Sequence, residues 1–329
     1  MAKKRIVMNR NLDRGPLRVE KIHRSDWIKL EDFFEFYKKF LEGKKLEGIA
    51  ERTLDDYEKH LDYITPYITS PSRFDKDRAI TVEKIRAYQT FMLNEKQYKP
   101  TTINIRLRTL KAFFHWLYKE GYIDDKLYKC IKLMRTPVDL VQPLSKEDIK
   151  KMLRAPDMNL YNGYRDYLLM LLMLDTGIRV KEAVNLKIDD VDTRRGVIVV
   201  RGEISKTRSF RELPISLDTC KRFREIIKIS KKYDNNYVFL NELGGKLSAA
   251  TVSWCFRNYG KKVGINGKCS PHVFRHTFAT NFIRKGGDVF TLQRIMGHST
   301  LLTTRRYIQL DIDDLKQKHK KFSLLEEYI

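Results

Sequence analysis

Apolar residues recur at helical spacing through the first third of the chain. Between positions 26 and 135 they return every three or four residues in four successive runs, which is the period of one face of an α-helix. A threonine able to accept a free backbone N–H at a helix start stands near the beginning of the later runs, and the fourth run stops near Gly121. These threonines are Thr53, Thr81 and one of the pair Thr101 and Thr102. The pattern predicts a bundle of four or five helices over residues 26–137, with the aromatic side chains as its core.

The pattern changes after residue 135. Residues 136–144 hold two prolines and show little periodicity, which predicts an extended linker because proline lacks an amide donor. The run from Ser145 to Asp148 has the form of a capping box that opens a new helix. Further helical patterns lie near 145–154, 164–175, 180–186, 217–230, 248–259, 272–284 and 288–296.

Two short β-rich runs interrupt these helices. Residues 197–201 and 209–215 predict a pair of antiparallel strands with Lys206 on the loop between them. We therefore expect a mainly α fold: an N-terminal helical bundle, then an α+β domain over residues 138–329 with a small antiparallel β-sheet.

The balance of charges points to a polyanionic partner. Among 329 residues there are 65 lysines and arginines against 42 aspartates and glutamates, a formal net charge of +23. Such a charge favours DNA or RNA as the partner. Residues 1–25 are basic and aperiodic, so they fit equally a flexible arm that lies along DNA and a solubilising tail.

The same survey argues against several classes of protein. No apolar run is long enough to span a bilayer, and no apolar core of a secretory signal follows the basic N-terminus. The four cysteines include no Cys-x-x-Cys pair, so neither a zinc knuckle nor a disulfide framework is expected. These features predict a cytoplasmic, nucleoid-associated protein with no membrane partner, metal or cofactor.

Residues with the chemistry of phosphodiester cleavage gather in the second domain. Cleavage without metal needs a nucleophile, cations for the non-bridging oxygens, and groups that accept and donate protons. The stretches that supply them are Thr176-Gly177-Ile178-Arg179, Ser205-Lys206-Thr207, His272-Val273-Phe274-Arg275-His276, Gly297-His298-Ser299 and Thr303-Thr304-Arg305-Arg306-Tyr307.

The order and local context of these residues resemble the tyrosine recombinase (phage-integrase) family. The resemblance covers both halves of the chain: the bundle over 26–137 is similar to the family's core DNA-binding domain, and residues 138–329 are similar to its catalytic domain. It implies that Tyr307 is the nucleophile and that Arg179 and Arg275 clamp the scissile phosphate, for which planar guanidinium groups are suited.

The resemblance also implies three proton-handling or hydrogen-bonding roles. His272 would assist proton transfer at the tyrosine, His298 would hydrogen-bond the phosphate, and Lys206 would protonate the leaving 5′-oxygen. A lysine on such a loop can also serve only as a contact to the DNA backbone.

Other residues near these motifs suggest different roles, such as the binding of a metal ion. His272 and His276 have the spacing of zinc ligands, but Val273 stands where a His-Glu-x-x-His metalloprotease has its glutamate, so His276 is better read as supporting the site. Asp189, Asp190 and Asp192 could suggest Mg²⁺, although a solvent-exposed turn explains them better. Glu182 follows Arg179 by three positions and could orient an arginine or act as a capping group.

The implied activity is site-specific DNA recombination through a 3′-phosphotyrosine intermediate, without metal or ATP. The expected partners are double-stranded recombination sites and three further copies of the chain, with the C-terminal tail, residues 308–329, docking on a neighbouring subunit; packing on its own domain is the alternative. Integration or excision of a mobile element is the favoured role, and Xer-like resolution of chromosome or plasmid dimers is the alternative. A type IB topoisomerase-like relaxase, a catalytically silent DNA-binding protein and a basic RNA-binding module are the remaining readings.

Overall fold

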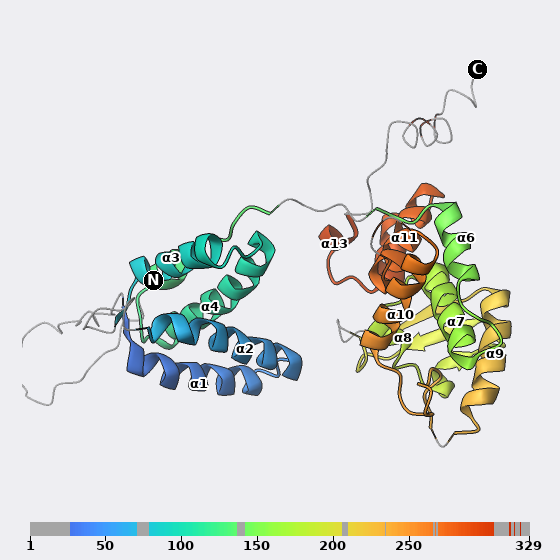
Figure 1. Cartoon of the computed structure of the whole chain (residues 1–329), viewed down its shortest axis with the longest axis horizontal. Coiled ribbons are helices and arrows are strands. Elements are labelled where there is room, and N and C mark those ends of the chain that lie inside the picture. Colours follow the sequence, from blue (N-terminus) through green and yellow to red (C-terminus); the bar gives the residue numbers. More distant parts are fainter. Residues whose placement is uncertain are drawn as a thin grey trace, which may run out of the picture. The chain divides into compact units, whose positions relative to one another are not determined.

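The chain divides into two compact units, Met1–Val138 and Asp139–Ile329, which we describe one at a time (Figure 1). The computed structural model describes residues 27–70, 79–136, 142–205, 210–233, 235–265, 267, 269–305, 316, 319 and 323. The basic arm 1–25, Lys206, Tyr307 and nearly all of the tail lie outside the described residues. Helices dominate both units and a small antiparallel sheet lies in the second, so the predicted fold class is confirmed.

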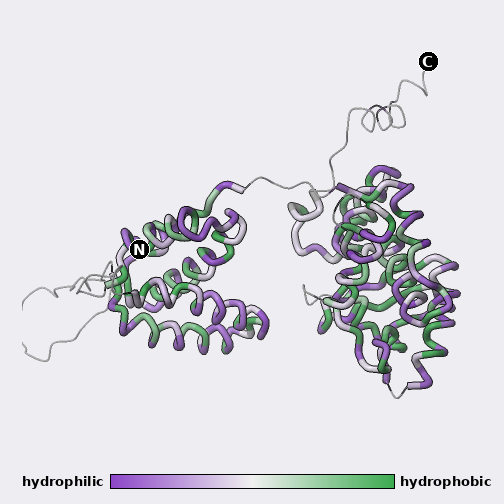
Figure 2. Tube along the Cα trace, in the orientation of Figure 1, coloured by the Kyte–Doolittle hydropathy of each residue, from purple (hydrophilic) through white to green (hydrophobic). Residues whose placement is uncertain are grey.

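The first unit is a helical bundle built around aromatic rings. Its helices are α1 (Leu30–Leu46), α2 (Glu51–Ile68), α3 (Val82–Thr90), the π-helical turn η1 (Phe91–Glu95), α4 (Pro100–Glu120) and α5 (Lys126–Lys129). Phe33, Tyr37 and Phe40 of α1 meet Phe113 of α4 with ring centroids 4.9–5.6 Å apart. Figure 2 shows apolar and polar residues alternating along these helices, as amphipathic packing requires.

Helix ends in this unit follow the predicted caps in part. The Thr81 hydroxyl accepts the Lys84 N–H at the start of α3, and Gly121 ends α4 in the left-handed conformation at φ 89°. However, α2 begins at Glu51, ahead of Thr53. Helix α4 begins at Pro100, because proline at the first helical position loses no hydrogen bond and already has a helical φ.

A two-stranded pairing in the first unit was not predicted. Strand β1 (Ile28–Lys29) pairs antiparallel with β2 (Ala79–Ile80). Two residues are too few to show the period of a strand in sequence.

The second unit packs helices around a three-stranded sheet. The helices are α6 (Lys146–Arg154), α7 (Tyr161–Thr176), α8 (Val180–Ala183), the 3₁₀ turn η2 (Ile188–Asp190), α9 (Leu217–Ser230), α10 (Ala249–Lys262), α11 (Pro271–Arg284), α12 (Val289–Met296) and α13 (Leu301–Arg305). The sheet has the order β3 (Val191–Asp192), β4 (Val197–Val200) and β5 (Arg211–Pro214), all antiparallel. Helix α11 lies against α7, and buried residues of both belong to the core of this unit. No helix among the described residues is both long and apolar enough to cross a membrane.

The aspartate cluster differs from the solvent-exposed turn expected from sequence. Asp190 is only 2% exposed; its carboxylate accepts the Lys187 N–H at 2.8 Å and pairs with Arg201 Nε at 2.5 Å. Asp192 lies on β3 and accepts the N–H groups of Arg194 and Arg195. Only Asp189 is exposed. The reason is that a buried carboxylate is stable where donors surround it, and the donors to Asp190 come from Lys187, just before η2, and Arg201, just after β4.

Candidate active site

The turn between α7 and α8 sets the position of Arg179. Gly177 ends α7 with φ 62°, a conformation that favours glycine. A Cβ at this position would lie 2.4 Å from Cδ1 of Phe278 on α11, so glycine also permits the close approach of the two helices. The next residues, buried Ile178 and then Arg179, lead into α8.

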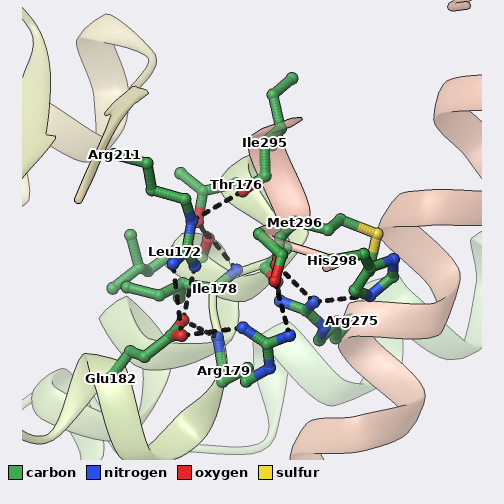
Figure 3. A network of polar contacts seen from close by, with 12 residues as sticks. Leu172, Thr176, Ile178, Arg179, Glu182, Arg211, Arg275, Ile295, Met296 and His298 are labelled. Atoms are coloured by element: carbon green, nitrogen blue, oxygen red, sulfur yellow. Dashed lines mark hydrogen bonds and ion pairs between the residues drawn. The ribbon is translucent and has the colours of Figure 1, made fainter. Parts of the chain in front are cut away.

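Arg179 is oriented by two neighbours. Its backbone N–H donates to Glu182 Oε2 at 3.1 Å and its Nη1 donates to Glu182 Oε1 at 2.9 Å, while Nη2 donates to the Gly297 carbonyl at 3.1 Å (Figure 3). The Arg179 side chain remains 22% exposed. The guanidinium group is therefore held in place and still open on one side.

Arg275 lies deeper, in the first half of α11. It donates through Nη1 to the Gly177 carbonyl, and through Nη2 to the Met296 carbonyl at 2.7 Å and to His298 Nε2 at 3.0 Å. These acceptors come from the α7–α8 turn and from the segment that ends α12. Arg275 and Arg179 thus bond to consecutive carbonyls, those of Met296 and Gly297, which brings the two guanidinium groups to the same place.

His298 joins this pair through the turn that follows α12. Gly297 ends that helix in the left-handed conformation, at φ 61°. Arginine cannot accept a hydrogen bond, so His298 Nε2 is the acceptor and the proton of the neutral ring belongs on Nδ1. Nδ1 lies 2.9 Å from the hydroxyl of Thr304, which is fully buried on α13. The Gly-His and Thr-Thr stretches of the sequence are thereby brought together.

Two further side chains, Arg211 and Glu182, belong to the network. Arg211 on β5 donates to Glu182 through Nη2 at 2.6 Å and through Nη1 at 3.3 Å, and to the Ile295 carbonyl through Nε at 2.9 Å. Glu182 is 1% exposed. Burial alone would raise the pKa of Glu182, but the hydrogen bond and charge of Arg211 and the charge of Arg179 outweigh it, so the pKa is lowered.

Sequence reasoning considered Glu182 as a group that could orient an arginine, and it missed Arg211. A signal was present. Arg211 and Leu213 alternate with exposed residues on β5, so a charged residue occupies an inward position of a short strand. A charge at such a position usually has a buried partner.

The predicted histidines of α11 lie on the same helix as Arg275. His272 is exposed in the first turn of α11, three residues before Arg275. His276 is half-buried, and its pKa is lowered first by burial and then by its electrostatic interaction with His272. The structure therefore brings Arg179, Arg275 and His298 together, with His272 on the helix that carries Arg275. Lys206 and Tyr307 lie outside the described residues.

Within the part of the chain that the structure describes, no group of three or more His, Cys, Asp or Glu side chains is arranged to hold a metal ion. The chemistry that the site offers is that of fixed cations. Two guanidinium groups and a histidine meet where a phosphate could accept hydrogen bonds from all three.

Comparison with known proteins gives matches along both units. A model of the phage integrase family matches residues 142–313, and a model of the phage integrase SAM-like domain matches residues 32–133. The tyrosine recombinase XerC of Thermodesulfovibrio yellowstonii is 31% identical over 226 residues, 67% of this chain and 75% of that protein. The tyrosine recombinase XerA of Pyrococcus horikoshii is 30% identical over 298 residues, 90% of this chain and 95% of that protein.

Solved structures share the fold. The Tn1549 transposon integrase in complex with transposon right end DNA matches with a TM-score of 0.70 at 20% identity, covering 88% of this chain and 98% of that one. The XerH site-specific recombinase bound to its difH substrate matches with a TM-score of 0.66 at 21% identity, covering 87% of this chain and 83% of that one.

Proposed function

This chain belongs to the phage integrase family and is a tyrosine recombinase, an enzyme that cleaves and rejoins DNA at specific sites, and we propose that Tyr307 is its nucleophile. The tyrosine oxygen attacks the scissile phosphorus, the bond from phosphorus to the 5′-oxygen breaks, and a 3′-phosphotyrosine link forms. A 5′-hydroxyl from a partner duplex then attacks this link and releases the tyrosine. The energy of the broken ester is kept in the phosphotyrosine, so neither step needs ATP.

The observation that carries the proposal is the meeting of Arg179, Arg275 and His298. Negative charge accumulates on the non-bridging oxygens in the transition state, and fixed guanidinium groups stabilise it more than they stabilise the ground state. The hydrogen bonds of both arginines to backbone carbonyls hold the two groups before DNA arrives. Little reorganisation is then needed during the reaction.

His298 changes its hydrogen bond when the phosphate binds. In the free protein its Nε2 accepts from Arg275 Nη2. The neutral ring changes tautomer as the phosphate binds: Nδ1 gives its proton to solvent and Nε2 takes one from solvent. Nε2 then donates to a phosphate oxygen, Nδ1 accepts from the Thr304 hydroxyl, and Arg275 Nη2 turns to the same phosphate.

The two remaining groups move protons. His272, exposed on α11, takes the proton from the Tyr307 hydroxyl and returns it when the strand is resealed. Lys206 gives a proton to the departing 5′-oxygen, whose conjugate alcohol is a weak acid and leaves poorly without it.

The biological role that we propose is integration or excision of a mobile element. It rests on the Ser205-Lys206-Thr207 loop and its following Leu213-Pro214-Ile215, which resemble the phage-integrase form. Resolution of chromosome or plasmid dimers is the second candidate, because the matched relatives include XerC and XerA recombinases. On either reading four copies act on two paired duplexes, and the tail 308–329 docks on the neighbouring copy.

Covalent capture tests the chemistry. The protein is incubated with nicked suicide duplexes from its genomic surroundings, beside Tyr307→Phe and, as a matched control, Tyr233→Phe, which alters an exposed tyrosine of the same unit. We expect denaturing gels to show a protein–DNA adduct for the wild type and Tyr233→Phe and none for Tyr307→Phe. An adduct that survives in Tyr307→Phe would refute the nucleophile, and relaxation of supercoils without site preference would favour a topoisomerase.

The site at which adducts form decides between the two roles. Adducts at the ends of a flanking mobile element support integration or excision. Adducts confined to a single chromosomal or plasmid site, with resolution of a dimer substrate, would replace that role with dimer resolution.

A further inference from the structure

Arg211 occupies the centre of the network without reaching its open side. It lies on β5, and its side chain is 6% exposed. Its three guanidinium nitrogens donate to Glu182 twice and to the Ile295 carbonyl once, so one planar group connects β5, α8 and the end of α12 (Figure 3). Arg211 is thus buried behind the cations that would meet DNA.

The turn that precedes His298 also packs against Arg211. A Cβ at Gly297 would lie 3.0 Å from Nη1 and 3.1 Å from Cζ of Arg211. The Gly297 carbonyl in turn accepts from Arg179 Nη2. The Arg211 guanidinium therefore lies against the residue whose carbonyl orients Arg179.

Glu182 also connects Arg211 to Arg179, through the two oxygens of its carboxylate. Its Oε1 lies 2.9 Å from Arg179 Nη1 and 3.3 Å from Arg211 Nη1, and its Oε2 accepts from Arg211 Nη2 and the Arg179 backbone. One carboxylate thus faces two guanidinium groups. The negative charge of Glu182 is shared between Arg179 and Arg211. It therefore does not fully neutralise Arg179, which keeps positive charge for a phosphate.

We propose that Arg211 is a positioning residue for DNA cleavage: through Glu182 and Gly297 it sets the guanidinium plane of Arg179. This inference rests on the proposed role of Arg179 as a phosphate clamp. A lysine could pair with Glu182 as a point charge, but it could not also donate to the Ile295 carbonyl and lie flat against Gly297.

The test compares two substrates that differ only in charge. One suicide duplex carries the normal scissile phosphate, and the other a methylphosphonate, in which a methyl group replaces one non-bridging oxygen and the charge is lost. The first-order rate of adduct formation is measured at saturating protein. The transition state on the neutral methylphosphonate needs less charge stabilisation. A misplaced Arg179 guanidinium should therefore slow adduct formation less on this substrate than on the phosphate.

We expect Arg211→Gln to form adduct about 100-fold more slowly than the wild type on the phosphate, and within about fivefold of it on the methylphosphonate. Arg179→Ala should show the same pattern. Arg195→Gln is the control, because Arg195 makes an exposed pair with Glu212 on the same sheet, at 3.8 Å; its rates should equal those of the wild type.

Equal losses on both substrates for Arg211→Gln, with Arg179→Ala still charge-selective, would overturn the positioning role and leave Arg211 a structural residue only. A lack of charge selectivity in Arg179→Ala would instead refute the clamp itself. If Arg211→Gln does not fold, Arg211→Lys decides, because it keeps a cation beside Glu182. Arg211→Lys should form adduct about tenfold more slowly than the wild type on the phosphate and at nearly the wild-type rate on the methylphosphonate. An equal loss of rate on both substrates would again refute the proposal.

Discussion

At the scale of single residues, backbone carbonyls orient both proposed phosphate-binding arginines. Arg275 and Arg179 donate to the carbonyls of Gly177, Met296 and Gly297, two of which belong to left-handed glycines. A carbonyl attracts a guanidinium group without cancelling its charge as a carboxylate would. The carbonyl dipoles therefore offset part of the cost of placing two cations together, and Arg179 also pairs with Glu182, whose one carboxylate it shares with Arg211.

Gly297→Ala should impair cleavage beyond its effect on stability. Both Gly297 (φ 61°) and Gly264 (φ 68°) have left-handed backbones, but a Cβ at Gly264 would meet nothing within 4 Å, whereas one at Gly297 would press on Arg211. We expect each alanine variant to lose about 1 kcal/mol of stability from backbone strain. Only Gly297→Ala should also slow adduct formation at saturating protein, by about tenfold or more. Equal cleavage rates for the two variants would contradict this account.

Glu182→Gln should destabilise the second unit and make its stability depend less on pH in the acid range. Removing the charge leaves Arg211 buried beside a neutral amide, which should cost about 3 kcal/mol near neutral pH. The folded-state pKa of Glu182 lies below its usual value of 4.5, so its stabilising contribution is present above that value and is lost as pH falls through the folded pKa.

The measurement is the urea midpoint of the second unit, followed between about pH 6 and pH 3. The wild type should lose stability below about pH 4.5, and the difference between the two proteins should shrink there. A difference that stays constant over this range would show that the Glu182 charge does not contribute.

At the scale of elements, a short helix and a short strand supply much of the hydrogen-bond network of the site. Helix α8 and strand β5 have four residues each, yet Glu182 lies on α8, Arg179 immediately precedes α8 as its N-cap, and Arg211 lies on β5. Neither would be stable alone, since isolated helices and strands of this length are marginal in water. The α7–α11 packing and the sheet hold them, so the site depends on the core of its unit.

The bundle offers an element-scale test through His60. Its Nδ1 lies 2.6 Å from the Thr109 hydroxyl and joins α2 to α4. Burial lowers the pKa of His60; Asp56 opposes this and Arg106 adds to it. Because the folded pKa lies below the unfolded value of about 6.5, the unfolded state binds the proton better. The bundle should therefore lose stability as pH falls through about 6.5.

Hydrogen exchange of α2 and α4 amides in the full-length protein checks this, after correction for intrinsic rates. Protection should fall between about pH 7.5 and pH 5.5 in the wild type and much less in His60→Gln. A fall of the same size in both proteins would assign the pH dependence to other groups.

At the scale of the whole molecule, net charge governs the encounter with DNA. A formal charge of +23 spread over 329 residues attracts phosphates before any specific contact forms. Affinity then comes largely from displacing counterions, while the site accounts for the chemistry.

The association constant for duplex DNA should fall steeply and linearly with salt on logarithmic axes. For about 6–10 phosphate contacts, the loss between about 50 and 200 mM salt should be about 10³–10⁵-fold. Fluorescence anisotropy with a duplex that contains a cleavage site and one that lacks it gives both slopes. A nearly flat dependence would show that neutral contacts dominate binding.

The sequence by itself determined the local elements and the identity of most candidate residues. Helix α9 spans the residues that periodicity indicated, Ser145 and Thr81 cap their helices, and β4 and β5 pair as expected. These features depend on neighbours a few positions away, so they can be seen in a short window. Arg179, Arg275 and His298 could be singled out for the same reason, because their flanking residues form local motifs.

Only the tertiary structure decided how these residues are held. Arg211 meets Glu182 across 29 positions, Arg275 meets Gly177 across 98, and Arg179 meets Gly297 across 118. The burial of Asp190 depends in the same way on Arg201 of the adjoining strand end. A buried charge is stable only beside its partner, and which partner lies beside it follows from the packing of α7, α11 and the sheet, a property of the folded chain and of no segment alone.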